Sequence, residues 1–447
     1  MSKQESEKNE AERFRSKPYR ISRTAYLFEC TFEYFVLLLV TDAFLVKVLK
    51  SIGMSDATVG VLSTLSALAF LFQLLSIVAV RHITSTKLFV SAVHFVGQLF
   101  FMSLYLVPFL PAVPGGGYRQ AIAVVCMLIA YLGHHLVQPI LFRWGNSFVE
   151  PRHRGVYSAT KEMVSLLSGI AVTLTAGYVI DHFEASGNLH GGFIFAAFGI
   201  CIFSLSDLVC LLFISNDKKE KGEARPERVP MREVARGTLG NRCFLSVVLL
   251  ACLWNGAVYS SVGFLGTYRL NPHELALTVG TVQLMNVLGS LSRFALSRPF
   301  GRYADRHSFA SAIKLAMCLG IAAFAVSACT TPGNPIKVRI LVSLFLLLYH
   351  GCNAGMVANL TNIVYNYVDE RYFVAAIALK NSIAGLFGFL ISLQSARLLS
   401  RVQANGNTFL GLSLYGQQVL SVISILFAIA AMAVAHFVVS KQQRTIR

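Results

Sequence analysis

Long apolar segments recur along the whole chain and alternate with short polar connections. We expect twelve of them, at residues 24–48, 57–80, 88–110, 120–142, 156–180, 191–215, 243–268, 275–298, 309–330, 338–362, 375–399 and 415–439. A run of about 20 apolar residues is long enough to cross the hydrocarbon core of a bilayer as a helix. Backbone amides that face lipid must be satisfied within their own segment. The pattern therefore predicts an all-α membrane protein with twelve transmembrane helices.

The composition is that of a membrane protein. Hydrophobic residues make up 55% of the chain and charged residues only 14%, whereas a soluble domain carries about 25% charged residues. The charged start of the chain lacks the short apolar region and cleavage site of a secretory signal. All nine cysteines fall in predicted spans without metal-binding spacing, so we expect no disulfide framework, no metal site and no cofactor.

The positive charge is distributed unequally between the two sides of the predicted membrane. The net charge is +17, and 31 of the 39 Lys and Arg residues fall on the side that holds both termini. Positive residues accumulate on the cytoplasmic side of membrane proteins, so both termini are predicted to be cytoplasmic. Because the basic residues are scattered over short loops, nucleic-acid binding is not expected.

One stretch of the chain is present twice. Residues 149–188 align without a gap with residues 368–407, and ten of the forty positions are identical, among them Lys161 opposite Lys380. An offset of six spans gives two pseudo-symmetric six-helix bundles of the same orientation, at 24–215 and 243–440. Residues 216–242 between them are polar and charge-rich, which is typical of a cytoplasmic linker. Residues 1–23 and 441–447 are predicted to be cytoplasmic tails.

Two parallel six-helix halves joined by a cytoplasmic linker resemble the major facilitator superfamily (MFS) of transporters, of the bacterial type. The segment GRYADR at 301–306 resembles the GxxxDR loop of that superfamily, and PRHRG at 151–155 resembles its P-x-x-R-G signature. The resemblance covers residues 24 to 440 and assigns no subfamily. In the first half, the counterpart of the GxxxDR loop keeps only Arg81, so we expect a weaker gate there.

The two motifs predict a cytoplasmic gate. A carboxylate beside a helix N-terminus is stabilised by a positive charge of roughly half a unit. Asp305 is therefore a candidate latch that holds its helix against the start of the 375–399 span, where Arg371 and Lys380 add positive charge. The other residues assigned to gating from these motifs are Gly301, Arg306 and Arg154. The alternative is that Asp305 and Arg306 are solvated loop charges.

The resemblance implies that the first, fourth, seventh and tenth helices line a central cavity. The polar residues near the middle of these spans are Glu29, Glu33, His134, His135, Gln138, Trp254, Asn255, His350, Asn353 and Asn359. Ionisable groups deep in a membrane are costly and mark functional sites. We therefore assign proton coupling to Glu33 and Glu29, and substrate binding to the remaining eight. His134, His135 or His350 could share the proton-carrying role with Glu33. The alternatives are a structural ion pair for Glu33, helix-bridging histidines, and packing rather than sugar stacking for Trp254.

Three basic residues inside the spans have two interpretations. Lys161 and Lys380, which are related by the repeat, form either a paired cationic site for an anionic solute or a cytoplasmic gate with Glu29, Glu33 or Glu162. Arg293 is open to the same two interpretations and needs a carboxylate or carbonyl partner.

The sequence therefore predicts a secondary active transporter in the inner (cytoplasmic) membrane. It is expected to move a small polar organic solute, with a sugar-like one favoured, by proton-coupled alternating access. A drug/proton antiporter is disfavoured because the fifth span contains no Gly-Pro pair; an organic-anion transporter and a non-transporting membrane sensor remain alternatives. No P-loop or metalloprotease motif occurs, so neither an ATP-driven pump nor an enzyme is expected. The expected partners are the solute, the proton and the lipid bilayer, and the expected state is a monomer.

Overall fold

The chain folds almost entirely into helices in a computed structural model that describes residues 14–79, 83–111, 117–150, 154–215, 233, 237–369 and 372–442. Within these described residues, ten helical segments are long and apolar enough to cross a membrane. The charged helices α2 and α13 complete the predicted set of twelve. The long helices are α2 (Lys17–Leu39), α7 (Thr86–Leu106), α8 (Tyr118–Asn146), α9 (Arg154–Ala185), α10 (Leu189–Phe213), α12 (Arg242–Leu270), α13 (Val279–Arg306), α14 (Phe309–Ala328), α15 (Pro335–Asn362), α16 (Phe373–Ala404) and α17 (Gly416–Val434).

Two of the predicted spans are interrupted. The 24–48 span consists of α2 and α3 (Asp42–Ser51), which are separated at Asp42, whose φ is 47°; aspartate tolerates this left-handed conformation better than most residues. The 57–80 span consists of α4 (Asp56–Ser63), α5 (Leu65–Ala69) and α6 (Phe72–Ala79). At the first of these breaks the Thr64 hydroxyl donates to the Val61 carbonyl at 2.7 Å, a local bond that competes with the helical ladder.

Short elements complete the chain. A 3₁₀ turn, η1 (Val107–Phe109), follows α7, and another, η3 (Ile363–Asn366), follows α15. A hairpin of two-residue strands, β1 (Thr408–Phe409) and β2 (Leu412–Ser413), connects α16 to α17. The π-helical turn η5 (Ala435–Val439) extends α17.

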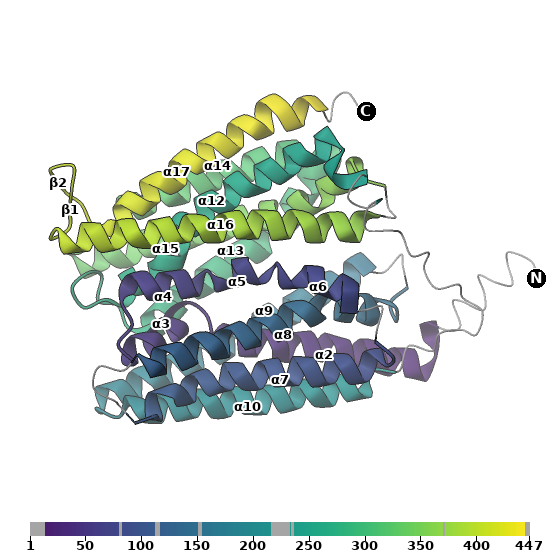
Figure 1. Ribbon diagram of the computed structural model, residues 1–447, viewed down its shortest axis with the longest axis horizontal. Helices are drawn as coiled ribbons and strands as arrows, with labels where there is room; N and C mark the ends of the chain where they lie inside the picture. Colours follow the sequence, from purple (N-terminus) through teal and green to yellow (C-terminus); the bar gives the residue numbers. More distant parts are fainter. Residues whose placement is uncertain are drawn as a thin grey trace, which may run out of the picture. The chain divides into compact units, whose positions relative to one another are not determined.

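The chain divides into two compact units. Unit 1 comprises Met1–Val48 and Leu75–Pro226, and unit 2 comprises Leu49–Leu74 and Glu227–Arg447. In unit 1, α2 packs on α9 and α10, and α7 contacts α8 and α10 (Figure 1). In unit 2, α12 packs on α16 and α17, α15 contacts α13 and α14, and α4 contacts α12 and α16. The predicted domain boundaries follow the order of the chain and remain a prediction.

Each unit has its own apolar core. Tyr26 and Trp144 are among the largest fully buried side chains of unit 1, and Phe244 and Phe324 are among those of unit 2. Burial of side chains of this size stabilises a fold by about 1.5–3 kcal/mol each in water. Lipid replaces water around the spans, so close packing rather than exclusion of water holds the helices together.

The duplicated stretch forms the same local structure twice. Helices α9 and α16 each contain 32 residues and begin and end at positions 219 residues apart. Two residues after the end of each helix lies a glycine with positive φ, 75° at Gly187 and 68° at Gly406. In both, the amide of the following asparagine, Asn188 or Asn407, donates to a carbonyl five residues earlier at 2.9 Å. This hydrogen-bonding pattern is that of a Schellman cap, and it requires a residue that adopts the left-handed conformation without strain.

Candidate functional site: a carboxylate–imidazole cluster in unit 1

A glycine contact brings α7 and α8 close together in unit 1. A Cβ added to Gly133 would lie 3.2 Å from the Cα of Gly97 and 3.1 Å from the Val93 carbonyl oxygen. Small residues let helix backbones approach in membranes. As a result His94, one turn before Gly97, and His134, directly after Gly133, lie with ring centroids 6.3 Å apart.

Polar side chains from four helices meet at this contact. Glu29 and Glu33 are one turn apart on α2, and His94 and Gln98 are one turn apart on α7, so each pair lies on one helix face. His134 comes from α8, and Asp207 comes from α10. We call this set the carboxylate–imidazole cluster; its members are Glu29, Glu33, His94, Gln98, His134 and Asp207.

The distances within the carboxylate–imidazole cluster are short. Glu33 Oε1 lies 3.0 Å from His134 Nδ1 and 3.8 Å from His94 Nε2. His94 Nε2 also lies 3.3 Å from Asp207 Oδ2, which accepts a hydrogen bond from Gln98 Nε2 at 3.0 Å. The same Gln98 nitrogen is 2.8 Å from His94 Nε2. His94 is thus placed between two carboxyl groups, and its Nε2 accepts a hydrogen bond from the Gln98 amide nitrogen.

The carboxylate–imidazole cluster is buried and rich in acidic groups. Glu29 and Asp207 are fully buried and His94 is 2% exposed. A small cavity adjoins the cluster and is lined by Glu33, Val36, Leu37, His94, Gly97, Gln98, Phe101 and His134. Among the described residues, no lysine or arginine forms an ion pair with the three carboxyl groups. Because unpaired buried charges are costly, the cluster needs bound protons or another cation to balance it.

Lys161 lies near one end of this cluster. Its Nζ is 3.2 Å from the Tyr26 hydroxyl and 4.4 Å from the centre of the Tyr26 ring. Glu29, one turn from Tyr26 on α2, accepts a hydrogen bond from the Cys30 thiol at Oε2, at 3.1 Å. The positive charge is therefore held on the aromatic ring, close to Glu29 but not paired with it.

The other predicted substrate residues fall into two groups. His135 is buried against the His134 ring and Gln138 is exposed, both on α8 of unit 1. In unit 2, Asn255, His350 and Asn353 are half-buried. Trp254 is 5% exposed within the unit 2 core, where a Cβ on Gly320 would meet its ring, and Asn359 is buried and donates to the Gly355 carbonyl at 2.7 Å. The assignment of these residues to a substrate site remains a prediction.

The predicted gating residues are distributed over both units. Gly301, Asp305 and Arg306 are exposed near the end of α13, and Arg293 is half-buried further back on the same helix. Lys380 is 3% exposed and donates to the Leu360 carbonyl at 3.0 Å. Arg81, Arg152, His153, Arg371 and most of the 216–242 linker lie outside the described residues; Arg154 begins α9, but its side chain is not described. The latch and gate assignments remain predictions.

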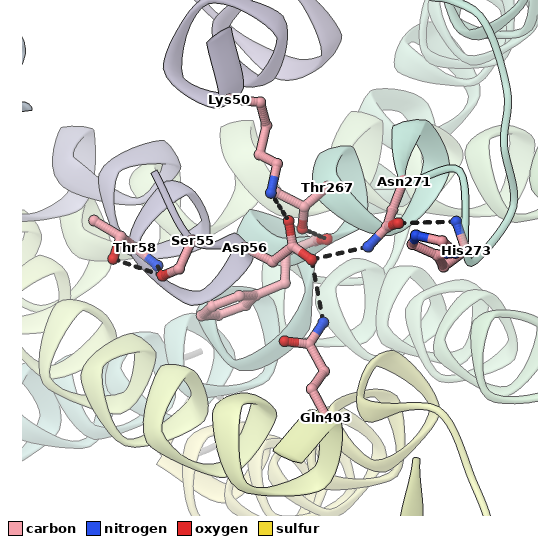
Figure 2. Close-up of polar contacts among 9 residues, drawn as sticks. Lys50, Ser55, Asp56, Thr58, Thr267, Asn271, His273 and Gln403 are labelled. Carbon is pink, nitrogen blue, oxygen red and sulfur yellow. Dashed lines mark hydrogen bonds and ion pairs between the residues drawn. The ribbon is translucent and has the colours of Figure 1, made fainter. Parts of the chain in front are cut away.

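A second polar cluster joins four helix ends in unit 2 (Figure 2). Asp56 Oδ1 accepts from Lys50 Nζ at 2.8 Å. Asp56 Oδ2 accepts from Asn271 Nδ2 at 2.9 Å and from Gln403 Nε2 at 3.2 Å. Glu274 lies in the connection after α12 and is 9% exposed. Burial and the charge of Asp56 raise the pKa of Glu274 to about 7, against opposing hydrogen bonds from Gln403 and Asn271 and the charge of Lys50.

Sequence reasoning did not identify three members of the carboxylate–imidazole cluster. His94 and Gln98 lie in the 88–110 span and Asp207 lies in the 191–215 span, and neither span is one of the four expected to line the cavity. The available signal was the spacing of His94 and Gln98, four residues apart on an otherwise apolar helix. The sequence also contains no close spacing of metal ligands, so it did not indicate that Glu29, Glu33 and His94 come within reach of one ion.

Comparisons with known proteins agree with this architecture. Residues 25–393 match the family described as the Major Facilitator Superfamily. A search of curated proteins finds no match. Among solved structures, a mutant of the nucleoside transporter NupG is 15% identical with a TM-score of 0.68, covering 92% of this chain and 99% of its own.

Two further solved structures are similar over nearly their whole length. A bacterial homologue of the human lysosomal transporter Spinster is 16% identical, with a TM-score of 0.67 and coverage of 97% of this chain and 99% of its own. A D-xylose–proton symporter is 13% identical, with a TM-score of 0.65 and coverage of 95% and 98%. At these identities the likeness shows the fold, while the match to the family covers most of the chain. The protein is therefore a multi-pass membrane transporter that belongs to the Major Facilitator Superfamily.

Proposed function

We propose that this transporter is a proton-coupled carrier of a small polar organic solute, and that it works by alternating access in the cytoplasmic membrane. The observation that carries the proposal is the carboxylate–imidazole cluster, in which three carboxyl groups and two imidazoles meet on four helices of unit 1. Chains of acidic residues and histidines within membrane helices are typical of proton relays.

The contacts within the cluster support proton exchange. Glu33 Oε1 is within ion-pair distance of both His134 and His94, and His94 is also within that distance of Asp207. An imidazole can bind a proton at one ring nitrogen and release it again, so these rings can pass a proton between carboxyl groups. The other charged or titratable groups close by are Glu29, Cys30, Tyr26, Lys161 and His135. Each proton that binds reduces the excess of negative charge and so lowers the affinity of the cluster for further protons. Bound protons are then released to the side of higher pH, where the proton concentration is lower.

A hydroxyl-rich solute is favoured. Asn255, His350 and Asn353 are half-buried hydrogen-bonding residues on α12 and α15, and such groups suit sugar-like ligands better than amphiphilic drugs. Two of the similar solved structures are named as transporters of nucleosides and of D-xylose, which are both hydroxyl-rich. The buried amino group of Lys380 would instead favour an anionic solute. A solute screen should include organic acids for that reason.

The proposal is tested in proteoliposomes that contain the purified full-length protein. A thermal-shift screen of sugars, nucleosides, organic acids and cationic drugs first identifies a bound solute, because binding stabilises the folded protein. Uptake of the labelled solute is then measured with and without an imposed pH gradient. We expect Glu33→Gln to lower gradient-driven uptake at least tenfold and to retain solute exchange without a gradient.

The matched control is Glu184→Gln, since Glu184 is an exposed glutamate on α9 that pairs with Lys47 outside the cluster. This control should behave like the parent. Gradient-driven uptake that is undiminished in Glu33→Gln would refute the proton-coupling role. If none of the screened solutes is taken up under any gradient, the proposed substrate class and proton coupling are wrong.

A further inference from the structure

We propose that the carboxylate–imidazole cluster also binds a divalent first-row transition-metal ion. One ligand atom from each of Glu29, Glu33 and His94 lies within 4.8 Å of the other two. Metal–ligand bonds of about 2.0–2.2 Å place neighbouring ligand atoms roughly 3 to 4 Å apart, so small side-chain movements bring all three atoms onto one ion. The three residues come from α2 and α7 of the same compact unit.

Two buried oxygen atoms give independent support. Glu29 Oε1 and Asp207 Oδ1 have no hydrogen-bond partner among the described residues, although both side chains are fully buried. The other oxygen of Glu29 accepts from Cys30, and the other oxygen of Asp207 accepts from Gln98. Most buried polar atoms in proteins are satisfied, and a cation is the partner that would satisfy these two.

Further ligands and space are close by. His134 Nδ1 lies 3.0 Å from Glu33 Oε1, and Asp207 Oδ2 lies 3.3 Å from His94 Nε2. Either residue can therefore join the first three as a fourth ligand or can orient one of them. The adjoining cavity is lined by Glu33, His94, Gln98 and His134, among other residues. The four packed helices thus supply both the metal ligands and the hydrogen bonds that orient them.

The donor types define the class of ion. Imidazole nitrogen together with carboxylate oxygen suits Zn²⁺, Mn²⁺, Fe²⁺ and Co²⁺, whereas Mg²⁺ and Ca²⁺ prefer oxygen ligands alone. A divalent ion also compensates the excess of carboxyl groups that no lysine or arginine neutralises among the described residues. Metal and protons would compete for the same side chains, so metal binding is expected to weaken as the pH falls.

The test measures metal binding directly and does not depend on transport. The metal-stripped full-length protein in detergent is titrated with Zn²⁺, Mn²⁺ and Co²⁺ by calorimetry at pH 7.5, and Mg²⁺ serves as the control ion. Bound Co²⁺ is also examined by its visible absorption, which reports nitrogen and oxygen ligands. We expect one saturable site for the transition metals, at least tenfold tighter than for Mg²⁺, and proton release on binding.

The variants His94→Gln and Glu29→Gln should weaken Zn²⁺ binding at least tenfold. The matched controls are His436→Gln, at an exposed position of η5, and Glu184→Gln, which should bind like the parent. Thermal unfolding without metal shows whether each variant is folded, and Glu33→Gln provides a further cluster variant if one is not. If the parent shows no saturable site, or if the cluster variants bind like the parent, the inference is wrong.

This inference and the proposed function fail separately. Proton-driven uptake by the parent protein is measured both with and without a chelator. If neither measurement shows such uptake, the proposed function is wrong whether or not metal binds. Uptake that persists in a protein without a saturable metal site would refute only the metal inference.

Discussion

Glu33 and His134 are 101 positions apart in the chain, yet the glutamate oxygen Oε1 lies 3.0 Å from the imidazole nitrogen Nδ1. The pair links α2 to α8 within unit 1 and leads to His94 and Asp207 on two further helices. Four helices therefore share one group of ionisable side chains. A change in the charge of any member alters the contacts of the others.

Replacing His134 tests whether this pair takes part in proton movement. We expect His134→Gln to lower gradient-driven uptake about tenfold, because the imidazole that contacts Glu33 Oε1 is removed. Initial uptake rates in proteoliposomes under an imposed pH gradient measure this. His436→Gln is the control, and parent-like gradient-driven uptake in His134→Gln would contradict the prediction.

Asp207 holds Gln98 in place, and this has consequences for stability. Asp207→Asn keeps a side-chain oxygen that can accept the Gln98 bond, so we expect it to unfold at a temperature close to that of the parent. Asp207→Leu leaves the buried Gln98 amide without this acceptor and should cost about 1–3 kcal/mol. Thermal unfolding in detergent compares the two variants. Equal stability of the leucine and asparagine variants would show that the Gln98 contact contributes little.

The glycine contact between α7 and α8 is expected to tolerate no large side chain. Gly133→Leu would force the two backbones apart, and the overpacking should cost about 1–3 kcal/mol or more. Since the same contact places His94 next to His134, transition-metal binding should weaken as well. The control is Gly301→Ala, because a Cβ at this exposed helical position meets nothing within 4 Å; alanine there should maintain or raise stability. A Gly133→Leu protein as stable as the parent would contradict the packing argument.

Glu274 makes the stability of unit 2 depend on pH. Its pKa in the folded protein is about 7, above its ordinary value of 4.5, because it is buried beside Asp56. The folded state therefore binds this proton more tightly than the unfolded state does, and its contribution to stability falls as the pH rises from about 4.5 to about 7. The full effect is at most about 3 kcal/mol.

The variant Glu274→Gln should remove this dependence. We expect it to be more stable than the parent at pH 8 and similar to the parent near pH 4.5, as measured by thermal unfolding over this range. Glu184→Gln is the control, since Glu184 is an exposed glutamate in unit 1. A difference between Glu274→Gln and the parent that stays constant with pH would show that Glu274 does not titrate in this window.

The sequence alone was sufficient to predict the all-helical membrane fold and the family. A helix makes all its backbone hydrogen bonds within its own segment, which lipid requires. Each spanning helix therefore corresponds to one apolar run, and the twelve runs can be recognised in the sequence without knowledge of any tertiary contact. The repeat was equally visible, and it predicted that α9 and α16 would correspond; both end in the same glycine-dependent cap. The breaks at Asp42 and Thr64 were not predicted, because a break in an apolar run leaves hydropathy unchanged.

The sequence identified Glu33, Glu29 and His134 as functional candidates, because an ionisable group inside an apolar run stands out by its cost. It did not show that His94, Gln98 and Asp207 join them, nor that Glu274 lies beside Asp56. Those relationships depend on which helix faces meet, and that is decided by the packing of distant segments, such as the backbone contact of Gly97 with Gly133. An ionisable residue within an apolar run can be recognised from the sequence, because the free-energy cost of burying it depends on that residue alone. The residue that it contacts is determined only when the helices pack.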